Sequence, residues 1–444
     1  MADEDEPSRH RSVPSSRIGR LGGFTRLAGG LAGGVLSEGA RRLASGERPP
    51  LDQLLLTPAN ARRLTDRLAH LRGAAMKLGQ MISMDAGDVL PPELADILAR
   101  LRERADFMPP RQLDKVLAEE WGKDWRRKFR RFEPRPIAAA SIGQVHRAMT
   151  PDGRMLAIKV QYPGVARSID SDVDNVASLL KLTGLLPPEL DIAPLLAAAK
   201  EQLREEADYL REGRMMERFA QMVEGRAEFV VPERVEELTT PRVLAMTYEE
   251  GSPIETLAGE GQSLRDETFA HLVELVAREL FDSRLMQTDP NFANYRWQAK
   301  TGRIVLLDFG AAREVSQGLS QDYRRLVEAG LSEDREAVLE AAIEAGFVNP
   351  RALERHPEAM RRAVDIVVTQ MASAEKLDFG NRAFVPEIRD TVMPIARDRE
   401  SWHLPPAETL FVQRKVSGTA LLGARLGARV DVRGIVERVL AETA

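Results

Sequence analysis

A polar loop at residues 287–294 places two residues that could take part in chemistry five positions apart. Asp289 follows Gln-Thr and precedes a Pro, and Asn294 ends the loop. In kinases, an Asp of this kind orients the attacking hydroxyl or water, and an Asn five residues later reaches a Mg²⁺ ion. Asp-Pro-Asn is also an ordinary turn sequence. The loop alone therefore leaves a phosphoryl-transfer site and a simple turn both open.

A second carboxylate stands at the end of an apolar run. Residues 304–307 read Ile-Val-Leu-Leu and are followed by an Asp-Phe-Gly that begins at Asp308. A carboxylate at the mouth of a strand can bind Mg²⁺ that bridges ATP phosphates. Asp308 lies 19 residues beyond Asp289, a separation that a short hairpin would close. A second Asp-Phe-Gly, at residues 378–380, lacks a preceding apolar strand, and we interpret it as a chance copy. We predict Asp289 as catalytic and Asn294 and Asp308 as metal ligands.

Lys159 lies within an apolar run, Ala-Ile-Lys-Val, that reads as a strand. A buried ammonium is costly without a counter-charge, so the sequence must supply a partner. Four acids offer one: Glu205, Asp208 and Glu212 follow one another at spacings of three and four and should share one helix face, and Glu206 flanks that face. In kinases a strand lysine holds the α- and β-phosphates of ATP while paired with a helix Glu. The alternative is a strand-edge lysine that reaches solvent.

A small sheet followed by helices is needed to position these residues. The hydropathy pattern predicts a hairpin at 142–148 and 155–160, helices at 165–183 and 194–223, strands at 229–231 and 242–248, a helix at 266–284, a loop at 285–295 and a strand at 303–307. The remaining C-terminal part reads as largely helical. This order is typical of an α+β fold with two lobes and a cleft between them. His146 falls in the hairpin, where we interpret it as a packing or hydrogen-bonding residue.

Four regions follow from the pattern. Residues 1–50 are a flexible basic segment rich in Gly and Arg, 51–130 a helical extension, 131–250 a sheet-rich N-lobe with inserted helices, and 251–444 a helical C-lobe. Residues 7–50 contain eight Arg and two acids, and their many Gly residues disfavour an autonomous helix. Such a segment can touch an anionic membrane surface, but a flexible tail explains its composition equally well.

The composition excludes several classes of protein. The chain has 444 residues, of which 43% are hydrophobic and 30% charged, as in folded globular proteins. It has 68 acidic and 63 basic side chains, and a net charge of −5 argues against a nucleic-acid partner. The absence of cysteine excludes disulfides, thiolate-bound zinc and thiol nucleophiles. No apolar run of about 18 residues predicts a membrane span, and the acidic start is unlike a secretory signal.

Five motifs occur in order along the chain: Lys77-x-Gly79-Gln80, the Ala-Ala-Ala-Ser-Ile-Gly-Gln-Val-His run from Ala138, Glu206-x-Asp208, Gln287-Thr-Asp-Pro-Asn, and the first Asp-Phe-Gly. Together they resemble the UbiB (AarF-domain) atypical kinase-like family over about residues 57–345. The start of the polar loop is similar to the branch linked to coenzyme Q biosynthesis. Three features depart from ordinary protein kinases: the Ala-rich segment replaces a Gly-rich loop, no Ala-Pro-Glu follows Gly310, and the helix with Lys77 is additional.

The resemblance implies a bilobal protein-kinase-like fold that binds ATP and Mg²⁺. The Ala-rich segment would lie over the nucleotide and would be stiffer than a Gly-rich loop. The segment 243–249 is similar to the strand that leads into the adenine-contacting hinge, although an ordinary core strand explains it equally well. The expected cofactor-binding residues are Ala138, Ala139, Ala140, Ser141, Lys159, Met246 and Tyr248.

The resemblance also implies roles for the charged residues. Lys159 would pair with Glu212, with Glu206 as the alternative partner. Lys77 would cross the cleft and meet Glu206 and Asp208, in the place where a peptide substrate docks in ordinary kinases. We therefore expect ATP hydrolysis, or transfer to a small or lipid-like acceptor, rather than broad protein phosphorylation.

In function, the resemblance implies a membrane-associated, Mg²⁺- and ATP-dependent atypical kinase or ATPase that supports ubiquinone biosynthesis or related lipid metabolism. Its expected partners are ATP, an anionic membrane lipid or a quinone-like lipid, proteins of ubiquinone biosynthesis and, in a homodimer, a second copy of the chain. We expect it to be cytoplasmic and peripheral on the inner face of the membrane. Two other functions stay open: a nucleotide-gated lipid-binding scaffold without physiological turnover, and a small-molecule phosphotransferase.

Overall fold

A computed structural model gives the fold of most of the chain. The structure describes residues 107–182, 193–289, 291–372, 375–381, 383–401 and 406–443. The predictions for residues 1–50, for the helical extension before residue 107 and for Lys77 lie outside the described residues. The chain divides into two compact units, one of Met1–Arg214 with Glu233–Tyr248 and one of Met215–Pro232 with Glu249–Ala444.

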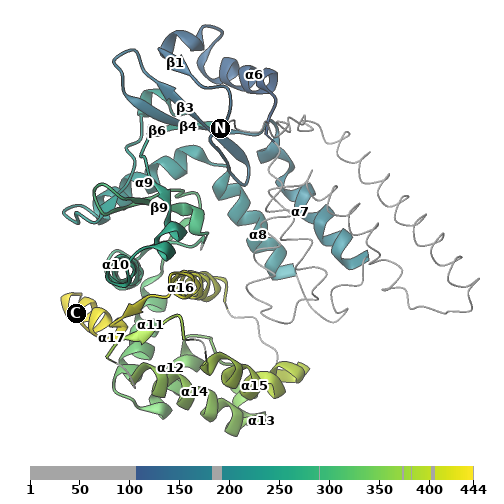
Figure 1. Cartoon of the computed structure of the whole chain (residues 1–444). Coiled ribbons are helices and arrows are strands. Elements are labelled where there is room, and N and C mark those ends of the chain that lie inside the picture. The colour runs from purple at the N-terminus through teal and green to yellow at the C-terminus, as the bar shows by residue number, and fades with distance from the viewer. Residues whose placement is uncertain are drawn as a thin grey trace, which may run out of the picture. The chain divides into compact units, whose positions relative to one another are not determined.

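The first unit is built on an antiparallel sheet (Figure 1). Its strands are β1 (Arg131–Phe132), β2 (Ala138–Ala139), β3 (Gly143–Met149), β4 (Met155–Gln161) and β6 (Val243–Thr247). The order is β1-β3-β4-β6, and β2 pairs with the free part of β3. Helix α6 (Pro110–Trp121) and the short helix η3 (Trp125–Lys128) contribute Leu117 and Trp125 to one apolar core with the strands. Strands β3 and β4 are the two strands of this sheet that are paired on both sides.

The predicted hairpin is confirmed, and local chemistry explains its turn. Strands β3 and β4 pair over their full length, from Gly143 opposite Gln161 to Met149 opposite Met155. Between them Gly153 has φ +91° and donates its N–H to the Thr150 carbonyl at 3.0 Å. Glycine is the residue that adopts this left-handed conformation at least cost.

Three helices in the first part of the chain follow the hairpin: α7 (Val165–Leu182), α8 (Ala193–Glu206) and α9 (Tyr209–Met222). The prediction of one helix over 194–223 is wrong, because the chain breaks at Ala207 and Asp208. The Asp208 Oδ1 accepts a hydrogen bond from the Arg211 N–H at 2.9 Å and so caps α9. A helix that begins with a capping carboxylate cannot also continue the preceding helix through that residue.

The second unit contains a small sheet, a two-stranded ribbon and most of the helices. Its strands are β5 (Phe229–Val230), β7 (Ser252–Pro253), β8 (Leu285–Gln287), β9 (Tyr295–Gln298), β10 (Arg303–Leu306), β11 (Ala312–Glu314), β12 (Leu377–Asp378) and β13 (Arg429–Val430). The sheet has the order β5-β10-β9-β7, and β8 pairs with β11. The predicted strand at 303–307 is present, whereas β8 and β9 replace the ends of the predicted loop.

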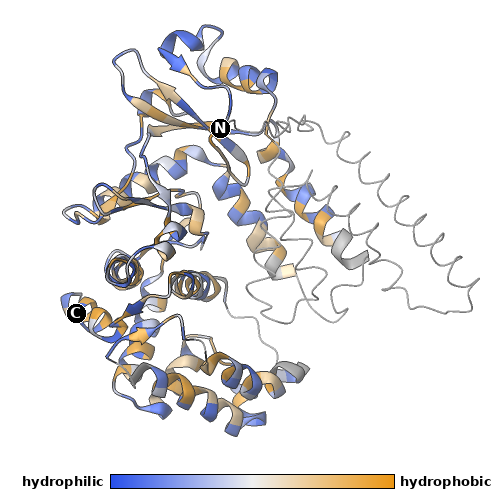
Figure 2. Ribbon diagram, viewed as in Figure 1, coloured by the Kyte–Doolittle hydropathy of each residue, from blue (hydrophilic) through white to orange (hydrophobic). Residues whose placement is uncertain are grey.

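The described helices of the second unit differ in how many side chains they bury. They are α10 (Gln262–Phe281), α11 (Gln317–Leu331), α12 (Arg335–Glu344), α13 (Pro350–Arg355), α14 (Pro357–Ala372), α15 (Phe384–Arg397), α16 (Ala407–Leu426) and α17 (Val432–Glu442), with short helices η4 (Glu236–Leu238) in the first unit and η5 (Ile254–Gly259), η6 (Phe292–Asn294) and η7 (Arg399–Ser401) in the second. Figure 2 shows hydrophilic and hydrophobic residues together along α14 and α17. None of the described helices combines the length and the apolar character that a membrane crossing needs.

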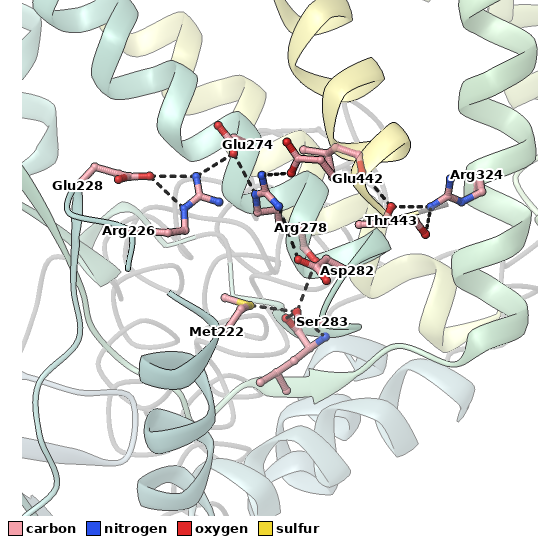
Figure 3. Close-up of polar contacts among 12 residues, drawn as sticks. Met222, Arg226, Glu228, Glu274, Arg278, Asp282, Ser283, Arg324, Glu442 and Thr443 are labelled. Atoms are coloured by element: carbon pink, nitrogen blue, oxygen red, sulfur yellow. Dashed lines mark hydrogen bonds and ion pairs between the residues drawn. The ribbon is translucent and has the colours of Figure 1, made fainter. Parts of the chain in front are cut away.

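Ion pairs fix helix α10, which leads into the polar loop (Figure 3). The Glu274 carboxylate of α10 accepts from Arg226, just before β5, and from Arg278, both at 2.9 Å. Arg278 also contacts Glu442 of α17 at 2.6 Å. Burial acts to raise the pKa of Glu274, but the hydrogen bond from Arg278 and the charges of the neighbouring arginines outweigh it and lower the pKa. The carboxylate therefore stays ionised and holds α10 to elements on both sides.

A buried chain of hydrogen bonds explains His146 in β3. The Met108 N–H donates to Gln144 Oε1 at 2.7 Å, so Gln144 Nε2 is the donor to His146 Nε2 at 2.8 Å. His146 Nδ1 then carries the proton and donates to the Glu133 carbonyl at 2.9 Å. Burial lowers the pKa of His146 to about 4, against the raising effect of the Glu133 hydrogen bond. The prediction of a hydrogen-bonding, packed histidine is confirmed.

Acid should destabilise the protein through this residue. The folded state disfavours the protonated imidazole of His146. The contribution of the neutral imidazole to the free energy of unfolding is therefore fully present above about pH 6.5. As the pH falls towards about 4, up to about 3 kcal/mol of that free energy is lost. Urea unfolding between pH 7 and pH 4.5 measures this loss. His146→Gln should flatten the pH dependence, whereas His271→Gln should leave it as in the wild type. An equally steep dependence in His146→Gln would contradict the assignment.

Candidate active site

Lys159 lies in the middle of β4, opposite Val145 of β3 and Leu244 of β6. Its side chain is buried, and its Nζ donates to Glu212 Oε1 of α9 at 2.6 Å. The Tyr209 ring centroid is 5.3 Å from the same ammonium. The alternative of a strand-edge lysine is therefore wrong, and the predicted pairing with Glu212 is confirmed. The pair holds the Lys159 ammonium in a fixed position within the buried part of the sheet.

The Ala-rich segment forms a tight hairpin against the sheet. Ala138 and Ala139 pair with β3, and the Ala140 N–H donates to the Gly143 carbonyl at 2.9 Å. A Cβ at Gly143 would lie 2.6 Å from both Val160 O and Tyr209 Oη, so only glycine fits there. Ser141 Oγ donates to Glu206 Oε2 at 2.7 Å, which ties the hairpin to the end of α8. The segment is thus held by backbone pairing and by a side-chain contact.

The acidic residues do not share one helix face, contrary to the prediction. Glu205 and Glu206 end α8, Asp208 lies in the break, and Glu212 belongs to α9. Glu206 is buried, whereas Asp208 is exposed and caps α9. Catalytic roles for Glu206 and Asp208 stay predictions.

The candidate adenine segment begins in β6, the edge strand of the sheet that pairs with β4. Met246 pairs with Ala157 of β4, and the Tyr248 N–H donates to the Met155 carbonyl at 2.9 Å. The Tyr248 N–H is therefore committed to the sheet. If this residue contacts adenine, its ring or its carbonyl is the group that does so.

In the second unit, the polar loop is folded back on itself. Asn294 is buried, and its Nδ2 donates to the Asp289 carbonyl at 3.3 Å. Asn291 caps η6 by accepting from the Ala293 N–H at 3.1 Å. An ordinary turn would need neither a buried amide nor this return contact, so the loop holds Asp289 and Asn294 in a defined relation.

Asp308 is brought to the same end of a hairpin as Asn294. Strands β9 and β10 pair Tyr295 with Leu306, and the Leu307 N–H donates to the Asn294 carbonyl at 2.8 Å. Asp308 itself has φ +61°, a left-handed conformation that is rare outside glycine. Its Oδ1 accepts from the Gly310 N–H at 3.1 Å, which supports that conformation locally. Backbone strain of this kind often occurs at functional sites.

Two side chains that were not among the predicted site residues connect the start of the polar loop to the segment that begins at Asp308. Gln287 Nε2 donates to the Asp308 carbonyl at 3.3 Å, and Thr288 Oγ1 donates to the Ala311 carbonyl at 2.8 Å. Both are buried at the end of β8. The available signal was the Gln287-Thr-Asp-Pro-Asn motif, which places both side chains directly before Asp289. Their burial, which requires hydrogen-bond partners, has no signal in the sequence.

The second Asp-Phe-Gly has a structural role. The Asp378 Oδ1 accepts from the Gly380 N–H at 2.9 Å, and its Oδ2 contacts Arg429 at 3.1 Å. Phe379 packs edge-on against Phe269 of α10 with ring centroids 4.8 Å apart. The copy anchors the β12–β13 ribbon to α10.

The residues around Asp308 suit a magnesium ion that arrives with a nucleotide. Among the described residues, no group of three or more His, Asp or Glu side chains is placed to hold a metal alone. Mg²⁺ on a nucleotide needs only one or two protein ligands, since phosphates and water complete its shell. Asp308 supplies a carboxylate, and Asn294 would ligate through Oδ1, because its Nδ2 is engaged by Asp289.

Comparisons with known proteins point in the same direction. A family model described as the ABC1 atypical kinase-like domain matches residues 100–342. The chain is 38% identical over 435 residues to "Atypical kinase COQ8B, mitochondrial" of Danio rerio, which covers 97% of this chain and 69% of that protein. It is 36% identical over 445 residues to "Atypical kinase COQ8, mitochondrial" of Saccharomyces cerevisiae, covering 99% and 88%. A Caenorhabditis elegans relative, "Atypical kinase coq-8, mitochondrial", is 37% identical, and the chain spans 58% of its length.

One solved structure is similar over most of its length. It is the complex of Rv3197 with erythromycin from Mycobacterium tuberculosis, with a TM-score of 0.61 and 25% sequence identity. The match covers 86% of this chain and 95% of that one. The predicted protein-kinase-like fold is confirmed.

Breaking the buried ion pair should be more harmful than replacing it. Glu212→Ala leaves the Lys159 ammonium buried without its carboxylate, and we expect a loss of about 3–5 kcal/mol in the free energy of unfolding. The double variant Lys159→Met, Glu212→Leu should recover most of that loss, because two apolar side chains can fill the same space. Urea unfolding of the variants measures both effects. Wild-type stability in Glu212→Ala would show that the ammonium reaches solvent.

Proposed function

Because this chain belongs to the ABC1 atypical kinase-like family, we propose that it is an Mg²⁺- and ATP-dependent atypical kinase or ATPase that supports coenzyme Q biosynthesis. The observation that carries the proposal is the buried ion pair between Lys159 and Glu212, at 2.6 Å. A charged pair in a sheet core adds little stability over apolar residues, which favours a ligand-binding role for the ammonium. The curated relatives named COQ8 supply the link to coenzyme Q.

In this proposal, the residues of the first unit and the segment that follows β6 bind the nucleotide. Lys159 binds the α- and β-phosphates, and Glu212 keeps its ammonium in place. The Ala-rich hairpin, residues 138–141, lies over the nucleotide, and Met246 and Tyr248 contact adenine. This hairpin is stiff and is held to Glu206 by Ser141, which favours tight nucleotide binding over fast turnover.

In this proposal, polar side chains of the second unit bind the metal and orient the acceptor. Asp308 and Asn294 hold Mg²⁺, which neutralises charge that develops on the phosphates. Asp289 orients the attacking water or hydroxyl. Gln287 and Thr288 keep these residues in register through the carbonyls of Asp308 and Ala311.

The acceptor is water or a small or lipid-like molecule in this proposal. Its basis is the family resemblance of the Lys77, Glu206 and Asp208 motifs, which would take the place of a peptide-docking surface. An anionic or quinone-like lipid on the inner face of a membrane suits the basic composition of residues 7–50. The names of the relatives place those proteins in mitochondria.

A second candidate function is phosphoryl transfer to a small molecule. It is favoured by the Mycobacterium tuberculosis structure, which is a complex with erythromycin. ADP formation with a panel of acceptors, including a macrolide and a quinone analogue, together with the mass of each recovered acceptor, distinguishes the two. A macrolide that gains a phosphoryl group as ADP forms would favour this second function.

Nucleotide should stabilise the protein in a way that depends on Asp308. We expect Mg²⁺–ATP to raise the melting temperature of the wild type by several degrees, as binding to the folded state requires. Asp308→Asn removes the charge but keeps a residue that tolerates the left-handed conformation, and it should lose most of this rise. Asp378→Asn, in the second Asp-Phe-Gly, is the matched control and should keep it. Equal shifts in both variants would count against the proposal.

A substitution of Asp289 distinguishes a catalytic function from that of a nucleotide-gated, lipid-binding scaffold. In a cell that depends on this protein for ubiquinone synthesis, Asp289→Asn should fail to restore synthesis, because the residue acts in the chemical step. The variant should still bind Mg²⁺–ATP. Restored synthesis would favour the lipid-binding scaffold without turnover.

A further inference from the structure

A buried cluster in the second unit has no place in the roles assigned above. The Lys415 Nζ lies 3.1 Å from Glu279 Oε2 and donates to Tyr295 Oη at 3.0 Å. Lys415 is 1% exposed and Glu279 is 0% exposed. A charge this deep in a helical unit is costly unless paired, so the cluster forms only with all its members in place.

The three residues come from distant parts of the chain. Glu279 lies near the end of α10, Tyr295 begins β9, and Lys415 lies in the middle of α16. Figure 1 shows α10 and α16 side by side, and their residues are in contact. Burial alone would lower the pKa of Lys415, but the negative charge of Glu279 outweighs it and raises the pKa. The ammonium therefore stays charged at the junction of three elements.

The cluster contacts the chain directly after the polar loop. The Lys415 Nζ donates to the hydroxyl of Tyr295, which directly follows Asn294. The Asn294 carbonyl accepts from the Leu307 N–H, and the Asn294 Nδ2 donates to the Asp289 carbonyl. One buried ion pair thus anchors the residue at which the segment with Asp289 and Asn294 enters β9.

We propose that Lys415, Glu279 and Tyr295 form a clamp that fixes the end of the polar loop and so positions Asn294 and, through the Asn294 side chain, Asp289. The consequence for catalysis rests on the proposed function, whereas the effect on loop geometry does not. Tyr295 also pairs with Leu306, two residues before Asp308. A loop end held in this way keeps Asn294 and Asp308 in register, although the clamp contributes no group to the reaction. The three are positioning residues.

Stability alone does not explain the cluster. Apolar side chains of similar volume can replace a buried ion pair with little change in stability. They cannot replace the hydrogen bond from Lys415 to the Tyr295 hydroxyl. What the ion pair adds over an apolar core is therefore a directional contact with the residue that follows the loop.

Hydrogen–deuterium exchange of the full chain tests the clamp directly. Tyr295→Phe removes only the hydroxyl, and the double variant Lys415→Met, Glu279→Leu replaces the ion pair with apolar side chains. In both we expect amides at 287–295 to exchange at least several-fold faster than in the wild type. Leu339→Ala in α12, a buried residue away from the loop, is the control for general destabilisation and should leave exchange at 287–295 unchanged.

A second measurement connects the clamp to function. In Tyr295→Phe, the Mg²⁺ concentration for half-maximal ATP turnover should rise about 10-fold, because a small displacement of a metal ligand has a large effect. A merely structural role would leave this concentration unchanged. If the wild type neither binds nor turns over ATP, the proposed function is wrong. The clamp is then tested by hydrogen–deuterium exchange at residues 287–295 alone. Unchanged loop exchange in Tyr295→Phe would overturn the inference, including where the double variant fails to fold.

Discussion

A lysine ammonium removed from water must meet a carboxylate, and this constraint organises both units. In the first, Lys159 in β4 requires Glu212, and that contact fixes where α9 begins relative to the sheet. In the second, Lys415 requires Glu279, and that contact joins α16 to α10. Apolar residues could fill both places with similar stability. The charges therefore indicate positions that a ligand or a loop depends on.

The groups proposed for metal binding are held by backbone geometry rather than by a metal-ligating cage. Asp308 adopts a left-handed conformation at the end of β10, and the Leu307 N–H binds the Asn294 carbonyl. Both residues are thus fixed by the β9–β10 hairpin before any ion arrives. Such preorganisation suits an ion that enters with phosphates and keeps much of its own shell.

The sequence predicted the elements with strong periodicity and missed those set by single contacts. The hairpin around Gly153 and the strand before Asp308 could be predicted from apolar spacing. The cost of a buried charge predicted only that Lys159 needs one of four nearby acids, and the family resemblance singled out Glu212. The break at Asp208 could not, since a capping carboxylate and a helix-face carboxylate look alike in sequence. Short strands such as β8 carry too few residues for a pattern. The contact between Lys415 and Glu279 spans 136 residues and has no local signature.

The central proposal is that Lys159 binds the phosphates of ATP and that this binding needs Mg²⁺ and the Asp308 carboxylate. An ATP analogue with an acyl group on its terminal phosphate transfers that group to a lysine amine beside the phosphates, and the labelled lysine is identified by mass spectrometry. The account predicts labelling of Lys159 that needs Mg²⁺, is blocked by excess ATP, falls strongly in Asp308→Asn and persists in Asp378→Asn. Absence of label on Lys159, or equal labelling in Asp308→Asn, would contradict it.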